Sequence, residues 1–147
     1  MKLQECFNTI RACEQMYEAG KAATAYFYEL CSNDPTLISG SLFRVNDIKN
    51  CSEDIEDTYL IKLFALFEVV LRDFEIKFLK RKSKSGIRQL IDKIASHQYV
   101  QDDVRKRVHI VRNYRNSVVH AGVSTPITLK DARSFLCQFL ANLPRNW

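Results

Sequence analysis

Two long stretches of this chain carry apolar side chains at helical spacing, and they constrain the fold more than any other feature. In residues 2–32 and 52–82, apolar residues recur mostly at steps of three and four, which places them on one face of an α-helix. The first stripe comprises Leu3, Cys6, Ile10, Cys13, Tyr17, Ala23, Phe27 and Leu30, and the second comprises Leu60, Phe64, Phe67, Leu71, Phe74 and Phe78. Two such helices must cover each other's apolar faces, so the pattern predicts a helical bundle.

Residues that break helices separate these two stretches. Asn33-Asp34-Pro35 ends the first helix, and Gly20 is a weak point within it. We expect a loop or short turn over residues 36–51. Ser52 is the expected N-cap of the second helix, because acidic residues follow it in the first turn, where the helix dipole favours them.

Three shorter helices are expected after a break at residues 83–86. They cover residues 87–97, residues 102–121 and the segment from Thr128 to Pro144. Gly122 is expected to adopt the left-handed conformation that closes the fourth helix. Thr128 and Asp131 resemble a capping box at the start of the last one. With no strand alternation, the predicted fold is all-α: an antiparallel bundle of four to five helices in a single domain over residues 1–147.

Composition excludes several classes of protein. No apolar run approaches the ~20 residues that a membrane span requires, and the N-terminus lacks a signal-peptide core, so we expect a cytoplasmic protein with no membrane partner. The five cysteines show no metal-binding spacing, and phosphate-loop, zinc-hydrolase and Gly-x-Ser-x-Gly motifs are absent, so we expect no metal and no cofactor. The net charge of +5 favours an anionic partner such as nucleic acid.

The end of the predicted fourth helix combines residues that suit phosphate chemistry. Arg115 is followed directly by Asn116 and, after four intervening residues, by His120. A guanidinium offers a rigid fork of donors to phosphate oxygens, and an imidazole exchanges protons near neutral pH. Cleavage of RNA by its own 2′-hydroxyl needs a base, an acid and charge stabilisation at the phosphate. Arg115, His120 and Asn116 are therefore the candidate catalytic residues, with Arg112 as a second phosphate contact.

The helical positions of these residues raise a question about Arg115. At about 100° per residue, the polar side of the helix carries Arg105, His109, Asn113, Asn116 and His120. Arg115 falls within the apolar side, between Val108 and Val111, where an unpaired charge costs several kcal/mol. It needs an anion, and the candidates are Glu68 or Glu75 on the second helix, or the phosphate of a substrate. Glu68 is thus a further candidate for the substrate-binding site.

Each of these residues also has a structural interpretation. Arg115 can belong to an ion pair with glutamate, His120 can cap the helix, and Asn116 and Arg112 can be simple surface residues. His97 and His109 read as ordinary surface or capping residues. A set of basic residues is either a track for the RNA backbone or a solvated face: Lys77, Lys80, Arg81, Lys82, Lys84, Arg88, Arg105, Lys106 and Arg107.

The motif resembles the signature of HEPN domains, a family of helical-bundle ribonucleases and toxins. That signature is an Arg, four to six residues, then a His, often with Asn directly after the Arg. The resemblance is strongest across residues 104–122 and extends to the rest as a matching order of helices. It implies a homodimer whose two copies of Arg115 and His120 form one composite site. It also implies metal-independent RNA cleavage that leaves a 2′,3′-cyclic phosphate and a 5′-hydroxyl.

The resemblance further implies a toxin or defence effector with RNA as substrate and, in some cases, a cognate antitoxin. The alternative function is a non-catalytic HEPN-like helical module that dimerises or binds nucleotide or RNA. A basic bundle that binds duplex DNA is the third interpretation, and it lacks a recognisable helix-turn-helix.

Overall fold

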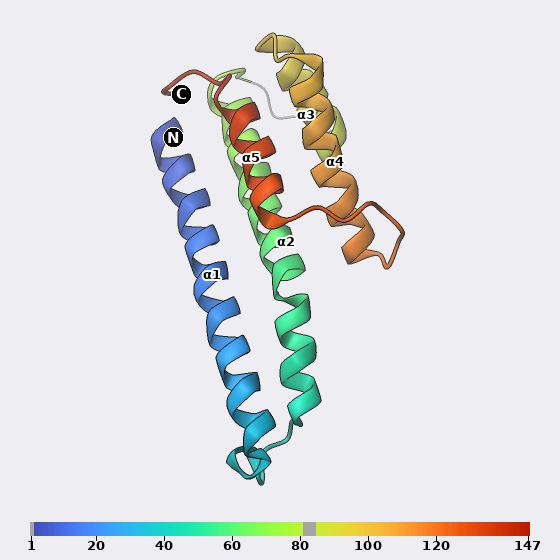
Figure 1. Ribbon diagram of the computed structural model, residues 1–147. Coiled ribbons are helices and arrows are strands. Elements are labelled where there is room, and N and C mark those ends of the chain that lie inside the picture. The colour runs from blue at the N-terminus through green and yellow to red at the C-terminus, as the bar shows by residue number, and fades with distance from the viewer. Residues whose placement is uncertain (1, 81–84) are drawn as a thin grey trace.

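Two long antiparallel helices, α1 (Leu3–Asn33) and α2 (Val45–Lys77), form the hairpin on which the rest of the chain packs (Figure 1). The computed structural model describes residues 2–80 and 85–147. A single 3₁₀ turn, η1 (Pro35–Ile38), lies between the two long helices. Three shorter helices follow: α3 (Ile87–His97), α4 (Asp102–Val119) and α5 (Leu129–Leu140). No strand occurs in the described residues, so the prediction of an all-α helical bundle is confirmed.

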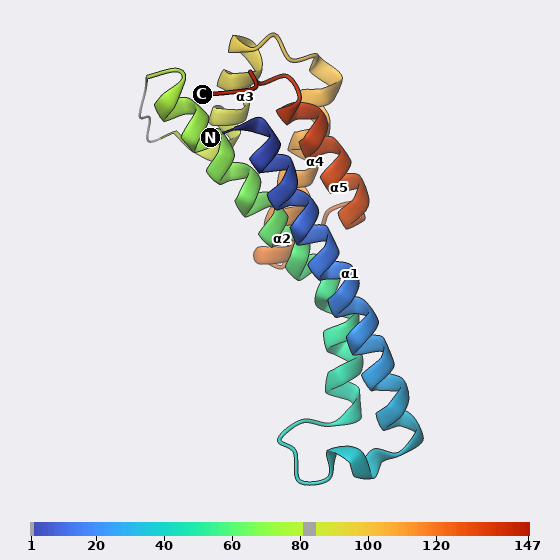
Figure 2. The ribbon, with the colours of Figure 1, turned by 90° about the vertical axis from the view of Figure 1, so that its left-hand side faces the viewer.

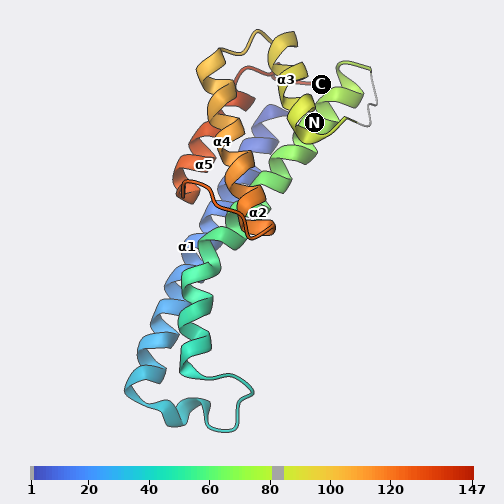
Figure 3. The ribbon, with the colours of Figure 1, turned by 90° about the vertical axis from the view of Figure 1, so that its right-hand side faces the viewer.

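The three shorter helices cover only one half of the hairpin. Figures 2 and 3 show α3, α4 and α5 grouped at the end where both termini lie, while the other half of α1 and α2 extends beyond them as a two-helix arm. Cys6, Ile10, Cys13 and Tyr17 of α1 are buried in the covered half, as their spacing predicts. In the arm, Phe27 and Leu30 stay 39% and 38% exposed, because no third helix packs there.

Aromatic side chains of α2 form the centre of the core. Phe64, Phe67 and Phe74 are almost completely buried, and the Phe67 ring meets Phe139 of α5 edge-on with 5.6 Å between centroids. The chain passes through Gly20 without a break in α1. A Cβ atom at that position would lie 3.0 Å from Cδ1 of Ile55, so the glycine lets α1 and α2 approach closely.

The second helix differs from the prediction at both ends. It begins at Val45, and Ser52 lies inside it rather than at its N-cap. Asp47 caps the start by accepting a hydrogen bond of 2.7 Å from the Arg44 backbone N–H. The next residue, Ile48, is buried. The helix ends at Lys77, so residues 78–80 are not helical, and residues 81 and 82 of the predicted segment lie outside the described residues.

The last two helices begin and end close to the predicted positions. Thr128 caps α5, since its Oγ1 accepts from the Asp131 N–H at 3.1 Å and donates to the Asp131 carboxylate at 2.8 Å. Helix α5 ends at Leu140, ahead of Pro144. In the described part of the chain, no helix combines the length and the apolar character that a membrane span requires.

The C-terminus of α4 closes differently from the prediction. The left-handed residue is Ala121, with φ of 52°, whereas Gly122 does not adopt a positive φ. The Gly122 N–H donates to the Ser117 carbonyl at 2.8 Å, and the His120 N–H donates to the Asn116 carbonyl at 3.0 Å. The bond from Gly122 to Ser117 is the longer of the two bonds of a Schellman closure, with alanine in the left-handed position that usually holds glycine.

We therefore expect Ala121→Gly to stabilise the protein. A left-handed conformation costs a non-glycine residue ~1–2 kcal/mol, which the greater freedom of glycine in the unfolded chain partly offsets. The net gain of about 0.5–1 kcal/mol should appear as a rise of roughly 1–4 °C in Tm by thermal unfolding. Gly122→Ala is the matched control, because a Cβ there would make an ordinary contact of 3.5 Å with Ser117 Cα. A loss of stability in Ala121→Gly, or a large loss in Gly122→Ala, would contradict this account.

Candidate functional site

Arg115, Asn116 and His120 lie together at the C-terminal end of α4. Arg115 Nη1 donates to Asn116 Oδ1 at 3.0 Å. Asn116 precedes His120 by four residues, which places both side chains on the same side of the helix. His120 is the C-cap residue and its side chain is exposed. Arg115 and Asn116 are therefore in contact, while His120 follows one turn later and makes no side-chain hydrogen bond to either residue in the described structure.

Arg115 lies against the core, as its helical position predicts. Its guanidinium carbon is 6.0 Å from the centroid of the buried Phe64 ring, within the range of a cation–π contact. The Arg115 Nε is buried and has no hydrogen-bond partner. No ion pair in the described part of the chain includes Arg115. Its charge is therefore held close to an aromatic ring without a carboxylate to balance it.

Neither of the glutamates expected to pair with Arg115 does so. Glu68 Oε1 lies 3.4 Å from Nη2 of Arg72 on the same helix. Glu75, which is 1% exposed, contacts the Lys93 ammonium at 2.7 Å. Within the described residues, no hydrogen bond or ion pair joins Glu68 to Arg115, Asn116 or His120. Of the anions considered for Arg115, the two glutamates are therefore paired with other cations, and the structure does not bring Glu68 to the motif.

Contacts to α2 hold the end of α4 in place. The Tyr114 hydroxyl donates to Asp57 Oδ1 at 2.8 Å, and burial together with this hydrogen bond raises the pKa of Tyr114 to about 12. Glu56, the residue before Asp57 on α2, accepts a hydrogen bond of 2.7 Å through its Oε1 from the Leu129 N–H at the start of α5. Two neighbouring carboxylates of α2 therefore hold α4 at the residue before Arg115 and hold the first residue of α5.

A second cluster on α4 was not predicted from the sequence. His109 Nε2 lies 2.8 Å from Asp92 Oδ1 of α3, in a pocket between the two helices. Arg112 lines the same pocket, which also includes Arg88, Arg105, Lys106 and Asn113. His109 is thus part of a basic pocket rather than an ordinary surface residue. The sequence signal that could have indicated this pocket is the spacing of Arg88 and Asp92, which lie one turn apart on α3.

The remaining members of the predicted basic track divide into three groups. Lys77 pairs with Asp73 at 2.7 Å, and Arg107 pairs with Asp103 at 3.6 Å, so both charges are balanced locally. Lys80 is exposed at the end of the segment after α2. Arg81, Lys82 and Lys84 lie outside the described residues. Among the members of the track that the structure describes, Arg88, Arg105 and Lys106 meet in one place, the pocket beside His109.

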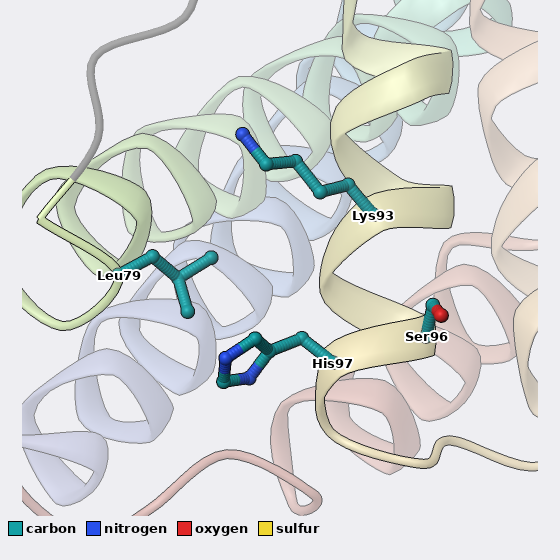
Figure 4. Close-up of a pocket in the computed structure, with 4 residues that line it drawn as sticks. All are labelled: Leu79, Lys93, Ser96 and His97. Carbon is teal, nitrogen blue, oxygen red and sulfur yellow. The ribbon is translucent and has the colours of Figure 1, made fainter.

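A further pocket lies between the end of α2 and α3. Leu79, Lys93, Ser96 and His97 line it, and Figure 4 shows Lys93 and His97 extending from α3 toward the side of Leu79. The ammonium of Lys93 is bound to Glu75. The His97 ring contacts the Gln98 amide at 2.9 Å and the edge of Phe78. Among the described residues that line this pocket, Lys93 is the one lysine or arginine, and its charge is already paired with Glu75.

Nothing in the described residues gathers three or more His, Cys, Asp or Glu side chains in a way that would hold a metal ion. Comparison of the chain with models of protein families, with curated proteins and with solved structures found no match.

Proposed function

We propose that this protein is a metal-independent endoribonuclease of the toxin or defence-effector type, which acts in the cytoplasm as a homodimer. One observation carries the proposal. The Arg115 guanidinium is partly buried, has no carboxylate partner in the described part of the chain, and is hydrogen-bonded to Asn116 beside the exposed His120. A cation held without an anion, next to a proton-transfer group, suits the phosphate of a substrate.

In the proposed reaction, the 2′-oxygen of the RNA attacks the neighbouring phosphorus and the bond from phosphorus to the 5′-oxygen breaks. One His120 imidazole accepts the proton of the 2′-hydroxyl. A second, protonated imidazole donates a proton to the leaving 5′-oxygen. The Arg115 groups stabilise the charge that develops on the phosphate, and Asn116 orients the neighbouring side chains. The products are a 2′,3′-cyclic phosphate and a 5′-hydroxyl.

Two copies of the chain are needed because one copy does not supply the full set of groups. His120 is five positions after Arg115, so its side chain is rotated by about 140° around the helix from that of Arg115. The other histidine on α4, His109, precedes His120 by about 16 Å along the helix axis and is bonded to Asp92. Val119 and Val123 are exposed apolar residues beside His120, and a second copy would cover them.

The test combines the chemistry of the products with the size of the particle. Purified protein is incubated with RNA in the presence of EDTA, and the fragment ends are identified by mass spectrometry. We expect cleavage to persist and to leave 2′,3′-cyclic phosphate and 5′-hydroxyl ends, and sedimentation to give a dimer. Intact RNA together with a monomer at micromolar concentration would contradict the proposal.

The second candidate function is a non-catalytic HEPN-like module that dimerises or binds nucleotide or RNA. The basic pocket beside His109 favours it, because that pocket can hold an anion without cutting it. This function predicts RNA that is bound but uncut, equally by the natural protein and by His120→Ala. A cognate antitoxin is a possible partner only of the nuclease, since a protein that cuts RNA needs restraint.

A further inference from the structure

The pocket between α3 and α4 concentrates positive charge around a single carboxylate. It has a volume of about 390 Å³. Four of its lining residues are cations, Arg88, Arg105, Lys106 and Arg112, and Asp92 is the one acid among them. Like charges this close together repel each other, and an anion bound among them would relieve that repulsion.

The carboxylate of Asp92 is already engaged. Its Oδ1 lies 2.8 Å from His109 Nε2 and 3.9 Å from Arg105 Nη1. Since a carboxylate only accepts hydrogen bonds, the Nε2 of His109 carries the proton in this contact. Arg105 has a second partner, because its Nη2 lies 2.9 Å from Asp102. Asp92 therefore holds the imidazole and one arginine, and it balances little of the remaining charge.

The other three cations of the pocket have no ion-pair partner in the described part of the chain. Arg88 and Lys106 are exposed. Arg112 Nη2 donates to Asn113 Oδ1 at 2.6 Å, while its Nε is buried without a hydrogen-bond partner. Burial lowers the pKa of Arg112 from its ordinary value, the charge of Arg88 lowers it further, and the charge of Asp92 acts in the opposite direction.

From this geometry we infer that the pocket binds a phosphate group through Arg88, Lys106 and Arg112. The contact between His109 and Asp92 joins α4 to α3 and so holds the two sides of the pocket together. Guanidinium forks match phosphate oxygens, and an ammonium adds a compact positive charge. A pocket of this volume accommodates a phosphate together with part of the nucleoside that carries it. The phosphate has two possible sources, the backbone of an RNA strand or a free nucleotide, which share this chemistry.

The position of the pocket relates it to the proposed catalytic end of α4. Arg112 and Asn113 line the pocket, and Asn116 and His120 continue the same side of the helix. From Arg112 to His120 the helix rises by about 12 Å, so a strand whose phosphate is bound in the pocket can extend to His120. This extension rests on the proposed nuclease function, whereas phosphate binding itself does not.

The first experiment measures binding of inorganic phosphate to the full chain by NMR titration. We expect saturable shifts of the Arg112 and His109 signals, and a loss of affinity of about tenfold or more in Arg88→Gln and in Lys106→Gln, as for a charged hydrogen bond. Arg11→Gln is the matched control, because it removes the same charge from an exposed position on α1. No saturable binding, or an equal loss of affinity in Arg11→Gln, would overturn the inference.

The second experiment identifies the source of the phosphate and uses the His120→Ala protein, so that no RNA is cut. A short oligoribonucleotide and a nucleoside 5′-monophosphate are each titrated, with and without Arg88→Gln. If only the oligonucleotide binds and its binding depends on Arg88, the pocket is assigned to an RNA strand. If both ligands bind equally and both depend on Arg88, the pocket is assigned to a nucleotide. Arg88-independent binding of both ligands would overturn the inference. Because no cleavage is measured, failure of the nuclease proposal would leave these results unchanged.

Discussion

Replacing His120 with alanine is expected to lower the rate of RNA cleavage by about 10²–10⁴-fold, the usual contribution of a general acid or base. In a symmetric dimer the substitution removes both proton-transfer groups at once. The His120 side chain is exposed and makes no hydrogen bond in the described structure, so the fold should not suffer. Cleavage of a fluorogenic RNA oligonucleotide in EDTA gives the rate, while circular dichroism and sedimentation check the fold and the dimer.

The matched control is His97→Ala, which removes an exposed histidine from the last turn of α3. It should cut RNA at the natural rate, because this residue lies outside the proposed site. A His120→Ala protein that retains the natural rate would rule out His120 as a catalytic residue. Equal losses of activity in both variants would show that the assay reports something other than the proposed site.

Replacing Lys93 with methionine is expected to have the largest effect on stability, about 3 kcal/mol of the free energy of unfolding. Glu75 is 1% exposed, and the Lys93 ammonium contacts its carboxylate at 2.7 Å. Arg72 lies further away, at 4.0 Å. Without Lys93, a buried carboxylate loses the counter-ion that contacts it at 2.7 Å, while methionine keeps most of the apolar stem. Urea unfolding measures the loss, which corresponds to a drop of roughly 6–12 °C in Tm.

Two further variants separate this effect from general damage. Lys49→Met removes a cation from an exposed pair, in which Lys49 Nζ lies 3.7 Å from Glu53, and should change stability by less than about 0.5 kcal/mol. The double variant Glu75→Leu with Lys93→Met should recover much of the stability, because it removes the buried charge together with its partner. A Lys93→Met protein as stable as Lys49→Met would show that the contact between α2 and α3 contributes little.

The helices could be predicted from the sequence, but their exact ends could not. Periodicity indicated five helical segments because residues three and four apart share a face in any α-helix. The N-cap of α2 was placed eight residues late, at Ser52 instead of Arg44, since a serine followed by acids is a common N-cap signal. Asp47 provides that cap instead, and Ile48 becomes buried once the hairpin forms. Likewise, the spacing of Phe27 predicted a buried face, yet it lies in the arm that no other helix covers.

The candidate site likewise has a part that could be predicted from the sequence and a part that could not. The motif alone indicated that Arg115, Asn116 and His120 share one end of a helix, because their spacing is local. It did not indicate which anion balances Arg115, and both glutamates proposed for that role contact other cations.

The helical character of the chain, the order of its helices and the motif at the end of the fourth follow from the sequence alone. The packing of the helices sets the contact of His109 with Asp92, the shared pocket of four cations, and the position of Arg115 on Phe64 with no carboxylate partner among the described residues. The physical reason is the range of the interactions. Helix hydrogen bonds and side-chain periodicity act within a few residues, whereas these contacts join different helices and depend on how the helices pack.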